Sequence, residues 1–153
     1  MNITIAAIGK ARAGPERALF EHYAGRLRWA LHLREADLKR PIEPVDRRRA
    51  AEADLLRNSI PAGAIIVALD ERGRDLSSRD FAKRIAAWRD AGRVDLAILI
   101  GGADGLDPAL RGQADLIWSF GKATWPHMLV RGMLAEQIYR AQTILDGHPY
   151  HRD

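Results

Sequence analysis

The last residues of the chain carry side chains that could do chemistry. Tyr150, His151 and Arg152 follow one another, and His148 stands three residues before His151. This polar and aromatic set has no evident role in a core, so it belongs to an active site, faces RNA, or is an ordinary chain end that frays. Two histidines without a third ligand rarely bind zinc, and we expect no metal site.

A glycine-rich loop is a second feature, and it follows an apolar run at residues 95–100. Gly101, Gly102 and Gly105 are three glycines within five residues. Glycine has no Cβ, so the backbone can approach a ligand closely there. The spacing is not that of the dinucleotide-binding fingerprint G-x-G-x-x-G. A ligand loop and a simple turn before a helix are therefore about equally consistent with it.

Residues 120–127 form a third unusual stretch, with the sequence Phe-Gly-Lys-Ala-Thr-Trp-Pro-His. A Gly-Lys pair also occurs in phosphate-binding loops of the type G-x-x-x-x-G-K-[ST]. That pattern fails here, because Leu116 stands at its first glycine and Ala123 replaces the hydroxyl residue. We therefore exclude a nucleotide triphosphatase. The loop backbone could instead hold the edge of an adenine, between apolar walls formed by Phe120 and Trp125.

Three further charged segments each have two interpretations. Residues 70–74 contain two arginines and could line a ligand pocket, or form a solvated crossover between elements. Three arginines at 47–49 could bind RNA, but a solvated helix start is the favoured interpretation. Glu136 and Arg140 are four residues apart on a helix, which is typical of a surface ion pair.

These segments must be positioned by elements that alternate along the chain. We expect strands at residues 2–8, 31–38, 64–69, 95–100 and 116–119, and helices at 15–28, 46–58, 77–91, 108–114 and 128–145. Such alternation predicts an α/β fold, with a mostly parallel sheet and helices on both faces. Ligands bind outside the carboxyl ends of the strands in such sheets, so the loops after residues 8, 69, 100 and 119 are the expected site.

The bulk composition limits the class of protein. The 153 residues fit one domain, 1–153, and the absence of cysteine excludes disulfides, zinc–thiolate sites and thiol catalysis. No apolar run approaches the roughly 20 residues of a membrane span, and the N-terminus has the wrong charge order for a signal peptide. The net charge is +4, and all but four of the 24 basic residues are arginine, which suits phosphate and stacked bases.

Four stretches of the chain match the motifs of one family. They are Leu99-Ile100-Gly101-Gly102-x-x-Gly105-Leu106, Ser119-x-x-x-x-Thr124-x-Pro126-His127-x-x-x-Arg131, Glu136-Gln137-x-Tyr139-Arg140-Ala141 and Pro149-Tyr150-His151. In these stretches the chain resembles the RlmH-type 23S rRNA (pseudouridine-N3)-methyltransferases, the smallest members of the SPOUT, or trefoil-knot, class. The resemblance covers essentially the full length, and the last third is its specific part.

The resemblance implies methylation of N3 of a pseudouridine in helix 69 of 23S rRNA, with S-adenosyl-L-methionine as cofactor. It also implies a cytoplasmic homodimer that acts on the assembled ribosome, and a C-terminal deep trefoil knot. A ribosome-associated RNA-binding protein without catalytic activity is the alternative function, since it would keep the basic charge and lose the cofactor.

By matching position, the resemblance implies eight cofactor contacts. They are Leu69, Gly101, Phe120, Gly121, Lys122, Ala123, Thr124 and Trp125. The chain departs from the family at Ala103, Gly121 and Ala123, where proline, serine and methionine are common. These departures matter little if the loop binds the cofactor through its backbone.

Methylation of an imide nitrogen needs a group that takes its proton and a group that stabilises the negative charge. A histidine titrates near neutral pH, so His127 and His151 are the candidate bases. Arg131 or Arg152 could stabilise the imide anion or hold a phosphate, and Tyr150 completes the candidate catalytic set. His127 could equally cap the long helix that begins there.

Overall fold

The computed structural model describes residues 1–152, and ten helices and strands alternate along them. In chain order they are β1 (Asn2–Ile8), α1 (Pro15–Ala24), β2 (Ala30–Ala36), α2 (Val45–Arg57), β3 (Ile65–Asp75), α3 (Ser78–Asp90), β4 (Asp95–Ile100), α4 (Pro108–Gly112), β5 (Leu116–Ser119) and α5 (His127–Leu145). Each element expected from the sequence is present, and most of the bounds agree within two residues.

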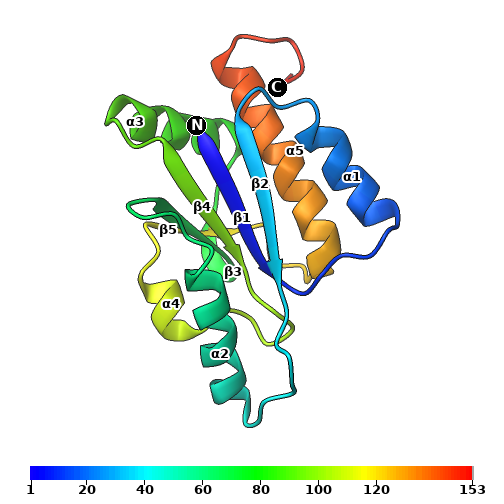
Figure 1. Ribbon diagram of the computed structural model, residues 1–153. Helices are drawn as coiled ribbons and strands as arrows, with labels where there is room; N and C mark the ends of the chain where they lie inside the picture. Colours follow the sequence, from blue (N-terminus) through cyan, green and yellow to red (C-terminus); the bar gives the residue numbers. More distant parts are fainter. Residues whose placement is uncertain (153) are drawn as a thin grey trace.

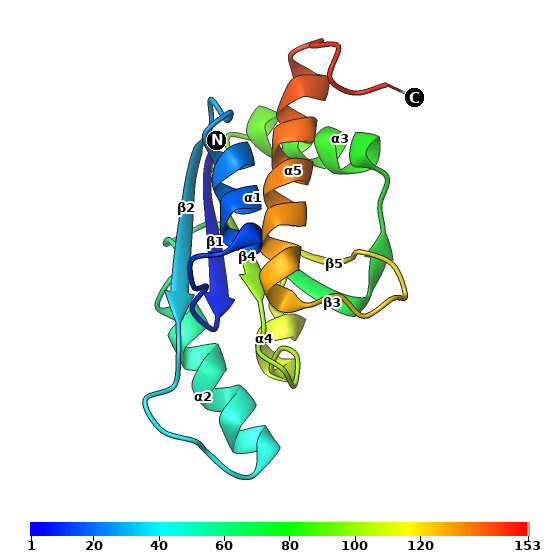
Figure 2. The same ribbon diagram turned by 90° about the vertical axis from the view of Figure 1, so that its right-hand side faces the viewer.

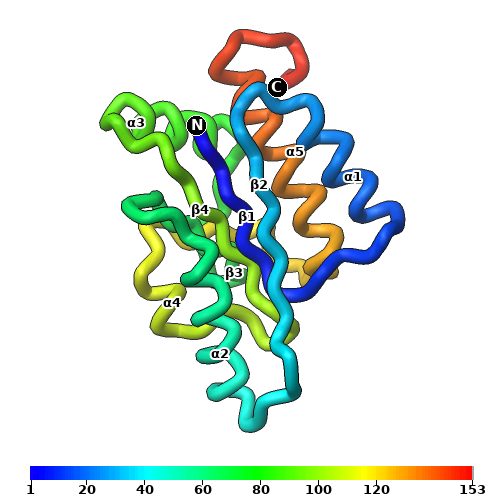
Figure 3. The backbone as a smooth tube through the Cα atoms, in the orientation of Figure 1, coloured from blue at the N-terminus to red at the C-terminus, as the bar shows by residue number. Residues whose placement is uncertain are grey.

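The five strands form one sheet in the order β2-β1-β4-β3-β5, in which every neighbouring pair is parallel (Figure 1). The predicted mostly parallel α/β sheet is therefore confirmed. The strand β4 ends beside Leu69 in β3, and β5 pairs with β3 on its other side, so the loops that follow β4 and β5 flank the same part of β3. The trace in Figure 3 follows the chain from β1 to α5 and the tail, which lies toward the end of the sheet where β1 begins.

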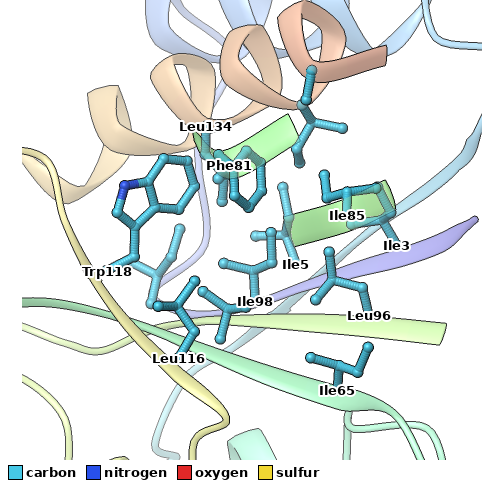
Figure 4. Packing of buried hydrophobic residues seen from close by; sticks show 14 of the residues in the cluster. Ile3, Ile5, Ile65, Phe81, Ile85, Leu96, Ile98, Leu116, Trp118 and Leu134 are labelled. Atoms are coloured by element: carbon cyan, nitrogen blue, oxygen red, sulfur yellow. The ribbon is translucent and has the colours of Figure 1, made fainter. Parts of the chain in front are cut away.

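Helices cover both faces of the sheet, as predicted. Successive side chains of a strand point to opposite faces, so each buried strand contributes apolar residues to both layers of helices. Ile3 and Ile5 of β1 face α3 and α5, where they share a core with Phe81 and Leu134 (Figure 4). The other face of the same strand, with Ala6 and Ile8, packs against residues of α2 and α4 such as Leu56 and Leu110. The helix α1 lies alongside α5 (Figures 1 and 2).

The structure corrects the interpretation of residues 70–74 as a loop. They continue β3, which slips in register between Leu69 and Arg74 and pairs along β5 to Asp75. The two backbones approach closely at Gly73, where an added Cβ would lie 2.7 Å from backbone atoms of Ile117 and Trp118. This long-range pairing makes a strand of a polar stretch whose local sequence is typical of a loop.

The helix α1 is shorter than predicted and ends at Ala24 rather than at residue 28. The buried side chain of Gln142 on α5 accepts hydrogen bonds from the backbone N–H groups of Arg28 and Trp29, at 2.9 and 3.0 Å. A contact from the other end of the chain thus holds residues 28 and 29 in the segment that leads into β2, and no local pattern could have indicated it.

Three further features of the fold are the cap of α3, the absence of a membrane-spanning helix among the described residues and the predicted knot. Ser77 caps α3, because its side chain accepts a hydrogen bond from the backbone N–H of Asp80. Within residues 1–152, no helix is both long and apolar enough to cross a membrane. The knot and the single domain 1–153 stay predictions, and Asp153 lies outside the described residues.

Candidate active site

A cavity of about 480 Å³ opens at the carboxyl ends of β4 and β5 and beside the middle of β3, at residues 69–72. Seven of the eight residues expected to contact a cofactor line it: Leu69, Gly101, Phe120, Gly121, Ala123, Thr124 and Trp125. The eighth, Lys122, is exposed and is not among the lining residues. Segments separated by up to about fifty positions in the sequence thus converge at the edge of the sheet where a ligand site was expected.

The glycine loop after β4 needs its glycines because the chain folds back on itself there. An added Cβ on Gly101 would lie 2.7 Å from the backbone carbon of Gly105. Gly105 itself has a φ of +80°, a conformation that favours glycine, and its N–H donates to the carbonyl of Gly102 at 3.0 Å. The resulting tight turn forms one wall of the cavity.

The loop between β5 and α5 forms another part of the lining, and local hydrogen bonds fix its shape. The hydroxyl of Ser119 accepts from the N–H of Gly121 at 3.1 Å and donates to its carbonyl at 3.0 Å. The indole N–H of Trp125 donates to the carbonyl of Phe120 at 3.1 Å, so the ring lies across the loop. Trp125 is 43% exposed, and this large apolar surface at the cavity faces solvent.

Charged side chains complete the lining of the cavity, and one of them has a buried N–H group without a hydrogen-bond acceptor. Arg111 forms an ion pair with Asp70 at 3.1 Å. Arg49, from α2, also lines the cavity, and its Nε is buried without a hydrogen-bond partner among residues 1–152. The exposed Arg72 lines the cavity as well, whereas Arg74 does not.

The arginines at 47–49 therefore differ from a simple solvated helix start, and Arg49 was missed as a site residue. Arg49 precedes Ala53 and Leu56, which are both buried, by four and seven positions. That spacing places all three on the inner face of a helix, and it could have identified Arg49 as inward-facing. Arg48 is also engaged, in ion pairs with Glu43 and Asp104 at 2.7 and 2.8 Å.

His127 is the candidate base that lies at the cavity. It is half-buried, lines the cavity and is the first residue of α5. The N-cap position belongs to Pro126, so His127 does not cap the helix as an N-cap residue would. Its imidazole thus has access to a ligand in the cavity.

Arg131, one turn further along α5, is directed into the protein instead. Only 1% of it is exposed. Its guanidinium donates to the carbonyls of Ile8 and Gly9 at 2.9 and 2.7 Å and forms an ion pair with Glu35. Burial lowers the pKa of Arg131, although Glu35 acts in the opposite direction. These contacts hold the loop after β1 beside His127.

The C-terminal tail packs on the far end of α5. The hydroxyl of Tyr150 donates to Glu136 at 3.1 Å, and its ring meets that of Tyr139 edge-on, with centroids 4.8 Å apart. Glu136 also accepts from Arg140 at 2.9 Å, and that hydrogen bond raises the pKa of Arg140. Burial raises the pKa of Tyr150. The Glu136–Arg140 pair is thus a half-buried support for the tail, and its interpretation as a surface ion pair is wrong.

The tail follows one end of α5 (Figures 1 and 2), and His127, which lines the cavity, begins the other end. The helix has 19 residues, which corresponds to about 28 Å. Tyr150, His151 and Arg152 are not among the lining residues of the cavity, and His151 instead contacts Arg140, at 3.2 Å. One chain therefore brings His127 together with the expected cofactor residues, but not the three tail residues.

Comparison with known proteins identifies the family of the chain. Residues 1–151 match a family described as "Predicted SPOUT methyltransferase". The ribosomal RNA large subunit methyltransferase H of Rhodospirillum centenum is 57% identical over 152 residues, which cover 99% of both chains. The protein of the same name from Paramagnetospirillum magneticum is 56% identical over 152 residues, again with 99% of both chains covered.

A solved structure supports the same assignment at the level of the fold. It is that of a probable methylase family protein from Haemophilus influenzae, with a TM-score of 0.62 and 13% identity. The match covers 95% of the present chain and 66% of the other. From its motifs, its sheet and these relatives, we conclude that the chain belongs to the SPOUT methyltransferase family.

Proposed function

We propose that this protein methylates large-subunit ribosomal RNA, with S-adenosylmethionine as the methyl donor. The observation that carries the proposal is the convergence of seven expected cofactor residues on one cavity, in a chain 57% identical to a protein named for this activity. In its finer form, the acceptor is N3 of a pseudouridine in helix 69 of 23S rRNA, on the assembled ribosome in the cytoplasm. One domain, 1–153, carries the whole activity.

The cavity fits such a cofactor in size and in chemistry. A volume of about 480 Å³ is within the range of about 300–1,000 Å³ that is typical of small-ligand sites. Two lining residues, Arg49 and Trp118, have buried N–H groups without an acceptor in the described part of the chain. Arg49 suits the carboxylate of the methionine moiety, and the indole N–H suits a ribose oxygen or the same carboxylate. The bound cofactor would supply an electrophilic methyl group.

His127 takes the role of the base in this proposal. The imide nitrogen of pseudouridine carries a proton, which must leave as the new N–C bond forms. His127 lines the cavity at the start of α5, within the region where a nucleobase would meet the cofactor. Arg131 is better suited to positioning, because its guanidinium is occupied by Glu35 and two backbone carbonyls.

The active site is completed by a second copy of the chain. Tyr150 and His151 contact Glu136 and Arg140, which lie nine and thirteen residues along α5 from His127, or about 14 and 20 Å. None of the three tail residues lines the cavity of its own chain. A two-fold axis that pairs two chains with their α5 helices antiparallel would bring each tail to the cavity of the other copy. In that homodimer, Tyr150, His151 and Arg152 act on RNA bound over the partner's cofactor.

Transfer of a tritiated methyl group onto ribosomes tests the proposal. The ribosomes come from a strain that lacks this modification, and the modified nucleotide is then mapped. We expect Gly101→Ala to abolish transfer, because the added Cβ would lie 2.7 Å from the backbone of Gly105. Gly112→Ala is the matched control, since nothing lies within 4 Å of its Cβ position.

Two outcomes would count against the proposal in different ways. Transfer to another nucleotide would refute the finer form and leave the methyltransferase activity intact. No transfer, together with no heat of S-adenosylmethionine binding in calorimetry, would favour an RNA-binding protein without catalytic activity.

A further inference from the structure

A buried carboxylate supports the glycine loop from behind. Glu52 lies on the inner face of α2 and is only 8% exposed. An ideal Cβ on Gly102 would lie 2.9 Å from one of its carboxyl oxygens and 3.0 Å from the other. The carboxyl group thus occupies the space beside the Cα of Gly102, on a loop that lines the cavity.

The same helix face holds the tip of this loop one turn earlier. Arg48 donates to the carboxylate of Asp104 at 2.8 Å and also binds Glu43 and the carbonyl of Ile42. Arg48 and Glu52 are four residues apart, so α2 contacts the loop at its tip and at its base. Glu52 is not among the lining residues of the cavity, so it acts on the loop rather than on a ligand.

Packing alone does not account for a glutamate at this place. Its Oε2 is buried without a hydrogen-bond partner among residues 1–152, which destabilises the folded state. Burial raises the pKa of Glu52, and Asp104 and Asp37 raise it further, while Arg48 lowers it. An apolar residue of similar volume would stabilise the packing more.

We propose that Glu52 is a positioning residue, which fixes the cofactor loop through its contact with Gly102. The loop has three glycines within five residues and would lose much conformational freedom on ordering. Because the carboxyl group packs against Gly102, the loop loses this freedom when the protein folds and not when the ligand binds. The affinity of the cavity for its ligand is therefore higher. The identity of the ligand rests on the proposed function, whereas the ordering of the loop does not.

The contact also explains why position 102 is a glycine. The backbone there has no left-handed φ, so an L-residue fits the chain conformation itself. What excludes a side chain is the carboxyl group of Glu52. Gly102 and Glu52 are therefore a steric pair, in which a change at one residue determines the effect of a change at the other.

Hydrogen exchange of the ligand-free protein tests the ordering. Glu52→Ala should raise the exchange rates of the amides of residues 101–106 by about tenfold, the order expected when a local contact of this size is lost. Glu52→Gln, which keeps the shape, should stay close to the wild type. Asp54→Ala is the matched control, because that carboxylate is on the same helix but faces solvent. Unchanged exchange at 101–106 in Glu52→Ala would overturn the proposal.

A double-mutant cycle tests the steric pair. Gly102→Ala alone should weaken S-adenosylmethionine binding by about tenfold in calorimetry, within the coupling range of contacting residues. In the Glu52→Ala background, the same change should cost less than about twofold, because the added methyl group enters the vacated space. Additive losses would overturn the pair, even if Glu52→Ala also lowered the stability of the whole protein.

These two experiments separate this inference from the proposed function. If the wild type binds no S-adenosylmethionine but Glu52→Ala loosens residues 101–106, the cofactor assignment fails and the positioning role stands. If the wild type binds the cofactor, and Glu52→Ala and Gly102→Ala behave as Asp54→Ala does, the positioning role fails and the cofactor assignment stands.

Discussion

The hydroxyl of Tyr150 donates a hydrogen bond to the carboxylate of Glu136 at 3.1 Å, and this contact ties the tail to the middle of α5. The ring of Tyr150 adds contacts with Tyr139 and with the guanidinium of Arg140, 4.8 Å from its centroid. The tail is thus a packed part of the fold, and its three polar residues are presented from one fixed place.

Tyr150→Phe should remove this hydrogen bond and keep the ring contacts. We expect a loss of about 1 kcal/mol in the free energy of unfolding, since Glu136 is half-buried and loses one donor. Urea denaturation measures it. Tyr23→Phe is the control, because its hydroxyl lies 3.4 Å from that of Tyr150 and makes a weaker contact. Equal losses in the two variants would contradict the importance of the Glu136 contact.

Arg131→Ala should destabilise the protein by about 3 kcal/mol, because it leaves the carboxylate of Glu35 without its ion-pair partner. Arg131→Met combined with Glu35→Gln should recover part of this loss, since no charge is then left unpaired. Denaturant unfolding gives both values. A variant Arg131→Ala that unfolds like the wild type but transfers no methyl groups would instead indicate a direct role in the reaction.

Mixing of two inactive variants can decide whether the tail acts across a dimer. His127→Asn and His151→Asn should each lower methyl transfer by about a hundredfold if both histidines take part in the reaction. If the site combines the cavity of one copy with the tail of the other, half of the randomly mixed dimers have one intact site. The mixture should then regain about a quarter of wild-type activity. No recovery on mixing would place the cavity and the tail of a working site in one chain.

The raised pKa of Glu52 predicts how stability depends on pH. A carboxyl group with a higher pKa in the folded state binds more protons when folded, so its contribution is fully present at low pH. That contribution is lost as the pH rises from the ordinary value of a glutamate through the folded-state pKa. Glu52→Gln should remove this part of the fall, so its stability relative to the wild type should increase from pH 4 to pH 8. A constant difference over this range would show that Glu52 does not titrate in this way.

The sequence indicated the order of the elements well, because apolar strands and helical spacing are local signals. It did not indicate the extension of β3, since residues 70–75 become a strand only by pairing with β5. It also did not indicate the end of α1, which depends on the side chain of Gln142, more than a hundred positions away. Both errors have one cause: a distant contact overrides the local preference of a segment.

Some parts of the candidate site could likewise be predicted from the sequence, and others could not. The cavity was predictable from the glycine loop, residues 120–125 and the rule that ligands bind at the carboxyl ends of parallel strands. The relation between the cavity and the tail was not, because sequence order says nothing about which end of α5 a short tail packs on. The side chains behind the loop were also missed, because Glu52 is a charged residue in a charged helix. Its position four residues before the buried Leu56 could have placed it on the inner face.

The length of α5 sets the distance between His127, at the cavity, and the start of the tail, because the helix connects the two. Each inserted residue would push the tail about 1.5 Å further out and rotate it by about 100° around the helix axis. A single insertion would thus aim Tyr150 away from its place, while an insertion of seven residues would keep the facing side but shift it by about 10 Å. Relatives with the same geometry should therefore vary in the residues of this helix far more readily than in its length.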